Sequence, residues 1–153
     1  MYIIRYNRLK NAIEEQRKKV KLIEPILWKP PWPEGLNEWE SGFEIRNEVI
    51  GISLFTNGAE EKLHYHEKTW EVYQVLEGKL KIAVKPYKKG EWSVVLLNEH
   101  DMIVLAPGTL HLVDSKSFHV TQVIQVPPAY HDQIVTTDQY EVDLANKKLN
   151  ENK

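Results

Sequence analysis

The pattern of the chain changes near residue 43, where apolar and polar residues begin to alternate with a period of two. In the clearest example, Leu80, Ile82 and Val84 alternate with lysines and one alanine. Such alternation predicts a strand with one face in a core and the other in solvent. Further strands are predicted at 50–54, 71–76, 91–97, 102–106 and 118–126. Because they are short and closely spaced, they favour an all-β fold, a closed antiparallel barrel or jelly roll.

The segments before the predicted barrel have a different pattern. Residues 5–23 place a few aliphatic residues at helical spacing beside a dense run of charges, so we expect a mostly exposed helix. Residues 24–42 contain four prolines and three tryptophans, which argues against a regular helix or a central strand. We expect this arm to pack across the outside of the barrel. A lid over the barrel mouth and an arm exchanged with a partner subunit are the alternatives.

The length of 153 residues suits one domain with a substantial core. Within it we predict an N-terminal helix and arm over residues 1–42 and a barrel over 43–136. Residues 137–153 are increasingly polar, so we expect a polar C-terminal tail with a frayed end.

Composition excludes several classes of protein and site. The net charge of −2 gives no sign of nucleic-acid binding by bulk charge. The chain has no cysteine, which excludes disulfides and thiolate metal sites. No apolar run approaches the roughly 20 residues that span a membrane, and the first residues lack the apolar core of a signal peptide. We therefore expect no membrane association and a cytoplasmic location.

A cluster of potential metal ligands lies in the middle of the chain. His64 and His66 are two residues apart, so on a strand they project from the same face. A polar turn follows, and a return strand from Glu71 would bring its carboxylate level with both imidazoles. Much later, an apolar strand ends at Pro107, and the chain re-enters extended structure carrying His111. We predict that these three histidines and one glutamate bind one divalent metal.

The two stretches that carry these residues resemble the two sequence motifs of the cupin superfamily. In the first, all five positions fit: Gly58, His64, His66, Glu71 and Gly78. In the second, Gly108 and His111 are in register, while three positions depart from the motif: His100 for glycine, Ala106 for proline and Ser115 for asparagine. The resemblance covers roughly residues 43–126. It implies a double-stranded β-helix, the cupin barrel, with a metal site inside.

The ligand set and the strand patterns suggest what surrounds the site. Imidazole and carboxylate suit iron, manganese, nickel, cobalt or zinc, and leave open positions for water or substrate. Tyr73 shares the inward face with Glu71, so it is a candidate substrate-binding residue. On 118–126 we expect the more apolar alternate set to face inward, which makes Gln122 a second candidate. By the same parity His119 faces outward, and His100 and His131 are not expected ligands.

The resemblance implies an enzyme that acts on a polar, oxygen-rich small molecule, with a lean towards isomerase or epimerase chemistry on a sugar or keto acid. A cupin-type Fe(II) dioxygenase and a non-catalytic small-molecule-binding module are the alternatives. The resemblance and the Trp-rich arm also suggest a homodimer.

Overall fold

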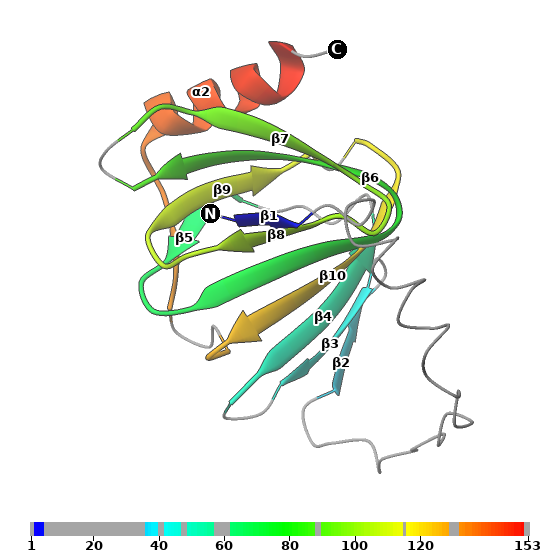
Figure 1. Cartoon of the computed structure of the whole chain (residues 1–153). Helices are drawn as coiled ribbons and strands as arrows, with labels where there is room; N and C mark the ends of the chain where they lie inside the picture. Colours follow the sequence, from blue (N-terminus) through cyan, green and yellow to red (C-terminus); the bar gives the residue numbers. More distant parts are fainter. Residues whose placement is uncertain are drawn as a thin grey trace, which may run out of the picture.

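The computed structural model describes residues 2–4, 36–39, 42–46, 49–56, 62–87, 90–114, 116–128 and 132–151. Within these ranges the strands form one 11-stranded sheet with antiparallel pairing, and the sheet curls round on itself (Figure 1). The all-β fold predicted from the period-two pattern is confirmed.

The main path through the sheet runs β11-β5-β9-β6-β10-β4-β3-β2, with β7 beside β6 and β8 between β6 and β1. In chain order the strands are β1 (Tyr2–Ile4), β2 (Leu36–Trp39), β3 (Gly42–Arg46), β4 (Gly51–Thr56), β5 (His64–His66), β6 (Trp70–Pro86), β7 (Ser93–Asn98), β8 (Met102–Leu105), β9 (Thr109–Val113), β10 (His119–Val126) and β11 (Gln133–Val135). A helix, α2 (Gln139–Glu151), follows the last strand.

Strand β6 joins the two halves of the barrel. The sequence predicted one strand at 71–76 and another around 80–84, but the chain runs through Gly78 as one strand of 17 residues. The first half pairs with β8 and β10, and the second half pairs with β7 and β9. Gly78 has a φ of +77°, and a Cβ there would collide with the backbone oxygen of Phe118. Only glycine therefore fits where β6 changes partners.

The barrel interior is filled by the apolar face of these strands. Leu80 and Ile82 are fully buried, as their alternation with lysines predicted. They belong to an inner cluster with Tyr73, Val75, Val84, Val95, Leu97, Ile103, Leu105, Val113 and Val123. A second cluster lies on the outer face of the sheet, beneath α2, and contains Leu63, Tyr65, Ala83, Leu110, Leu112, Ala145 and Leu149.

Most of the expected polar tail is a helix, because residues 139–151 form α2 and pack on the barrel, while the expected frayed end at 152–153 lies outside the described residues (Figure 1). Asp138 caps the helix, since its carboxylate accepts a hydrogen bond from the amide of Tyr140 over 3.0 Å. Leu149 is buried against the sheet, and the buried Lys81 ammonium donates to its carbonyl at the last turn. The Glu141 carboxylate accepts hydrogen bonds from Lys85 Nζ over 2.6 Å and from Trp92 Nε1 over 2.9 Å. These contacts hold a helix with a thin apolar stripe in place.

The N-terminal segment contributes two strands to the sheet. β1 pairs with β8, and β2 pairs with β3. The helix expected at 5–23 and most of the arm expected at 24–42 lie outside the described residues. Among the described residues, no helix is long and apolar enough to cross a membrane.

Candidate metal centre

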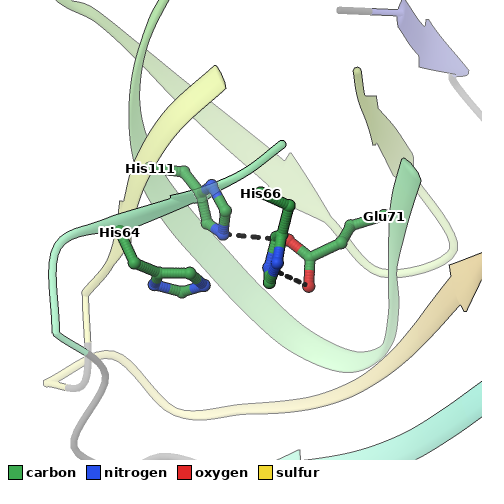
Figure 2. Close-up of side chains that lie close together, drawn as sticks. All are labelled: His64, His66, Glu71 and His111. Carbon is green, nitrogen blue, oxygen red and sulfur yellow. Dashed lines mark ion pairs between the residues drawn. The ribbon is translucent and has the colours of Figure 1, made fainter. Parts of the chain in front are cut away.

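Three short segments bring the predicted ligands together (Figure 2). His64 and His66 extend from one face of β5. Tyr65 points to the other face and stacks on Tyr87, with the ring centroids 4.1 Å apart. The antiparallel pairing of β5 with β9 sets His64 opposite His111. The turn after His66 returns the chain to Glu71 near the start of β6, as the sequence predicted.

The four side chains form one buried group. They offer ligand atoms that all lie within 4.8 Å of one another. His66 Nε2 lies 3.2 Å from Glu71 Oε1, and His111 Nε2 lies 2.9 Å from Glu71 Oε2 (Figure 2). None of the four residues is more than 3% exposed. Such separations around a common centre suit a single cation bound by nitrogen and oxygen ligands.

Backbone carbonyls orient two of the imidazoles in the same way. His64 Nδ1 donates to the carbonyl of Lys62 over 2.7 Å, and His111 Nδ1 donates to the carbonyl of Thr109 over 2.9 Å. A carbonyl can only accept, so we place the proton on Nδ1 in both rings. In its neutral form each ring then directs its Nε2 lone pair at the centre of the group. Metal-binding histidines commonly have this type of support on the second nitrogen.

The charge states also suit a metal site. Burial, together with the nearby His111, lowers the pKa of His64 to about 3, so this ring is neutral at pH 7. Burial alone would raise the pKa of Glu71, but the charge of His111 and the close polar contacts of the carboxylate with His111 and His66 outweigh it. The Glu71 pKa therefore lies well below its usual range. A neutral imidazole and an ionised carboxylate are the forms that bind metals.

Several buried polar atoms in the group have no hydrogen bond among the described residues. They include both ring nitrogens of His66 and Oε2 of Glu71. With the proton of His111 on Nδ1, its Nε2 and Glu71 Oε2 are two acceptors 2.9 Å apart. Such an arrangement needs either a second proton on His111 or a cation between the atoms, because two buried acceptors this close repel each other. The residues therefore fit a divalent metal.

Two side chains from distant parts of the chain hold this region. The carboxylate of Asp132 accepts hydrogen bonds from the amides of Glu67, Lys68 and Thr69 and from the Thr69 hydroxyl, at 2.6–3.1 Å. These bonds fix the turn between His66 and Glu71. In addition, Gln125 Nε2 donates to Glu71 Oε1 over 2.7 Å. No local sequence pattern marks either residue.

The inward set predicted for 118–126 is wrong. In β10 it is His119, Thr121 and Val123 that are buried, and Gln125 lies opposite Glu71. Gln122 pairs with Gln74 on the other face of the sheet, away from Glu71. The prediction assumed that the more apolar set faces inward, but the inward set of β10 is the more polar one, with Val123 among His119, Thr121 and Gln125. His119 and Thr121 satisfy each other inside, since the His119 ring and the Thr121 hydroxyl lie 2.9 Å apart.

The remaining residues singled out from the sequence are placed as follows. Tyr73 points inward and is buried, and its ring lies 5.9 Å from that of His111. His100 lies in the exposed turn between β7 and β8, outside the ligand group. His131 falls outside the described residues. Gly108, in the second motif, has a φ of +76° and donates its amide to the His66 carbonyl over 2.7 Å. This turn therefore ties β9 to β5 beside the site.

Comparison with known proteins shows similarity in structure. No protein-family model and no curated protein matches the sequence. An oxalate decarboxylase structure has a TM-score of 0.53 at 19% identity, covering 74% of this chain and 35% of that one. The capsular polysaccharide assembling protein CapF from Staphylococcus aureus has a TM-score of 0.52 at 15% identity, covering 69% of this chain and 32% of that one. The chain thus spans only about a third of each of these proteins.

At these identities the comparison establishes the fold, because similar folds carry many different functions. The antiparallel barrel, its likeness to these structures and the buried group of three histidines and one glutamate identify the chain as a protein of the cupin fold.

Proposed function

We propose that the chain is a metal-binding cupin whose single divalent metal is held by His64, His66, Glu71 and His111. The observation that carries this proposal is the buried group itself, in which four ligand atoms converge within 4.8 Å. A bound metal of this type polarises an oxygen substituent or acidifies water. With no thiolate in the set, iron, manganese, nickel, cobalt and zinc are the candidates.

The chemistry we propose is isomerisation or epimerisation of a polar, oxygen-rich small molecule such as a sugar or keto acid. Two structural neighbours have names that agree with this substrate class: one is an oxalate decarboxylase and the other a capsular polysaccharide assembling protein. Their support is limited to the fold, since identities are 19% and 15%. An Fe(II) dioxygenase and a non-catalytic binding module are the competing proposals.

The chain's own side chains have separate roles in this proposal. The three imidazoles and the carboxylate supply the ligands, and the carbonyls of Lys62 and Thr109 orient two of the rings. Tyr73 is our candidate for a substrate contact, because its buried ring lies 5.9 Å from that of His111. The apolar residues of the inner cluster exclude water from the floor of the site.

Elemental analysis of the purified protein tests the metal. We expect about one divalent ion per chain, and its loss in the double variant His64→Ala/His66→Ala. The matched control is His100→Ala, since His100 is exposed and outside the group. Unchanged metal content in the double variant would refute the site.

The bound ion then separates the competing reactions. Iron with oxygen consumption would favour the dioxygenase. Activity on sugars or keto acids without oxygen consumption would support the isomerase. Metal binding with no turnover of any compound in a screen, but with stabilisation by one of them, would favour the binding module. The homodimer and the cytoplasmic location expected from the sequence stay predictions; sedimentation velocity of the full chain tests the dimer.

A further inference from the structure

Gln125 makes a direct contact with the candidate ligand Glu71. It lies on β10, next to β6 in the sheet, and register places it directly opposite Glu71. Paired residues of neighbouring strands point to the same face, so both side chains project into the barrel. The Gln125 amide Nε2 donates to Glu71 Oε1 over 2.7 Å. This bond joins residues 54 positions apart, so it depends on the folded barrel.

The bond distinguishes the two oxygens of Glu71. Oε1 receives the amide of Gln125 and lies 3.2 Å from His66 Nε2, whereas Oε2 has no hydrogen bond and lies closer to a ligand nitrogen, 2.9 Å from His111 Nε2. A carboxylate can rotate about its last bond, and it exchanges oxygens unless something holds one of them. A primary amide suits this task, because its N–H donates at any ordinary pH and adds no charge to a buried site.

We propose that Gln125 is a positioning residue that holds Glu71 Oε1 and so directs Oε2 at the metal. This inference rests on the proposed metal site. It assigns to Gln125 the support that the carbonyls of Lys62 and Thr109 give to His64 and His111. Residues that orient ligands in this way commonly contribute about 10- to 100-fold to metal affinity.

The test compares metal affinity in Gln125→Met with that in the parent protein, using cobalt(II) and a competing chelator. Methionine is close to glutamine in length but has no N–H to donate, so packing is kept while the bond is lost. The matched control is Gln74→Met, because Gln74 points to the other face of the sheet on the strand that carries Glu71. A second variant, Gln125→Asn, keeps the amide on a shorter side chain that does not reach Oε1.

We expect cobalt affinity to fall about 10- to 100-fold in Gln125→Met and in Gln125→Asn, and to stay within about twofold in Gln74→Met. The visible absorption spectrum of bound cobalt should change in the first two variants, because ligand geometry changes. A general loss of packing would lower the melting temperature without altering this spectrum.

The outcomes separate this inference from the proposed function. If the parent protein binds no cobalt, the metal site itself is refuted. If the parent binds cobalt and both Gln125 variants match it in affinity and spectrum, the role of Gln125 is refuted while the site stands. Should Gln125→Met not fold, Gln125→Asn decides by the same criteria.

Discussion

Replacing Asp132 by alanine should loosen the turn that connects two metal ligands. The Asp132 carboxylate accepts from three successive amides, Glu67 to Thr69, and from the Thr69 hydroxyl. That turn spans the gap between His66 on β5 and Glu71 on β6. The variant removes the acceptor from all four donors at once.

The magnitude follows from which donors water can reach. The bonds to Glu67 and Lys68 are exposed, so water replaces them at little cost. Thr69 is only 1% exposed, and its amide and hydroxyl would lose a charged acceptor. Bonds of this type contribute about 1.5–3 kcal/mol each, and partial access of water reduces the sum. We expect a loss of about 2–3 kcal/mol in the free energy of unfolding, or roughly 4–12 °C in melting temperature.

The effect of Asp132 should also depend on pH. Burial raises the pKa of this carboxyl, but the hydrogen bonds from Thr69, Lys68 and Glu67 outweigh burial, so its pKa lies below the ordinary value of 3.8. The contribution of Asp132 to the free energy of unfolding is therefore complete at pH values above the ordinary pKa. It is lost as the pH falls through the lower pKa of the folded state. The difference in unfolding free energy between parent and Asp132→Ala should be constant from pH 5 to 7 and shrink below about pH 4.

Urea denaturation of the metal-free proteins measures this difference, and chelator competition measures the expected fall in metal affinity of about tenfold. Asp143→Ala is the control, because Asp143 is exposed and its carboxylate accepts a hydrogen bond from Gln139 in the same helix. Equal stability of Asp132→Ala and the parent at pH 7 would refute the reasoning. So would a difference that grows as the solution is acidified.

Three further predictions concern the metal, the barrel and the helix. Chelation of the metal should lower the melting temperature without unfolding the barrel. Bound metal should add about 2.7 kcal/mol to the free energy of unfolding when its concentration is a hundredfold above Kd. A circular dichroism spectrum of the apo-protein typical of an unfolded chain would contradict this. Gly78→Ala should cost about 3 kcal/mol in urea denaturation, since strain at positive φ adds to a clash with Phe118. The control Gly108→Ala, with positive φ but open space, should cost about 1 kcal/mol. Leu149→Ala should cost about 2–3 kcal/mol by the same assay, while the exposed Tyr140→Ala should cost less than about 0.5.

The sequence predicted what depends on local spacing. The period-two pattern located most strands, and the two-residue spacing of His64 and His66 with a returning Glu71 was enough to place these ligands on one face. The parity of 118–126 was wrong because it assumed that the more apolar face is buried, whereas the buried face carries His119 and Thr121 beside Val123. Since His119 and Thr121 satisfy each other inside the barrel, polarity alone could not indicate which face is buried.

Other features depend on contacts between distant residues. Helix α2 has two buried apolar residues, Ala145 and Leu149, so its hydrophobic pattern is weak. Its position depends on Glu141, which binds residues 49 and 56 positions away. Asp132 and Gln125 likewise act across 63–65 and 54 positions. No local spacing marks such residues, because each becomes important only when the barrel brings its partner close.

These contacts divide the candidate ligands into two kinds. His64 and His111 are oriented by carbonyls two residues before them, so their strands set the ring direction. Glu71 and the turn that leads to it from His66 are held by Gln125 and Asp132, which come from the last part of the barrel. Loss of either distant contact should therefore disturb the carboxylate and the turn while leaving His64 and His111 in place. The affinity of the site for metal thus depends on β10 and β11 being in register, which makes metal binding a sensitive report of correct barrel closure.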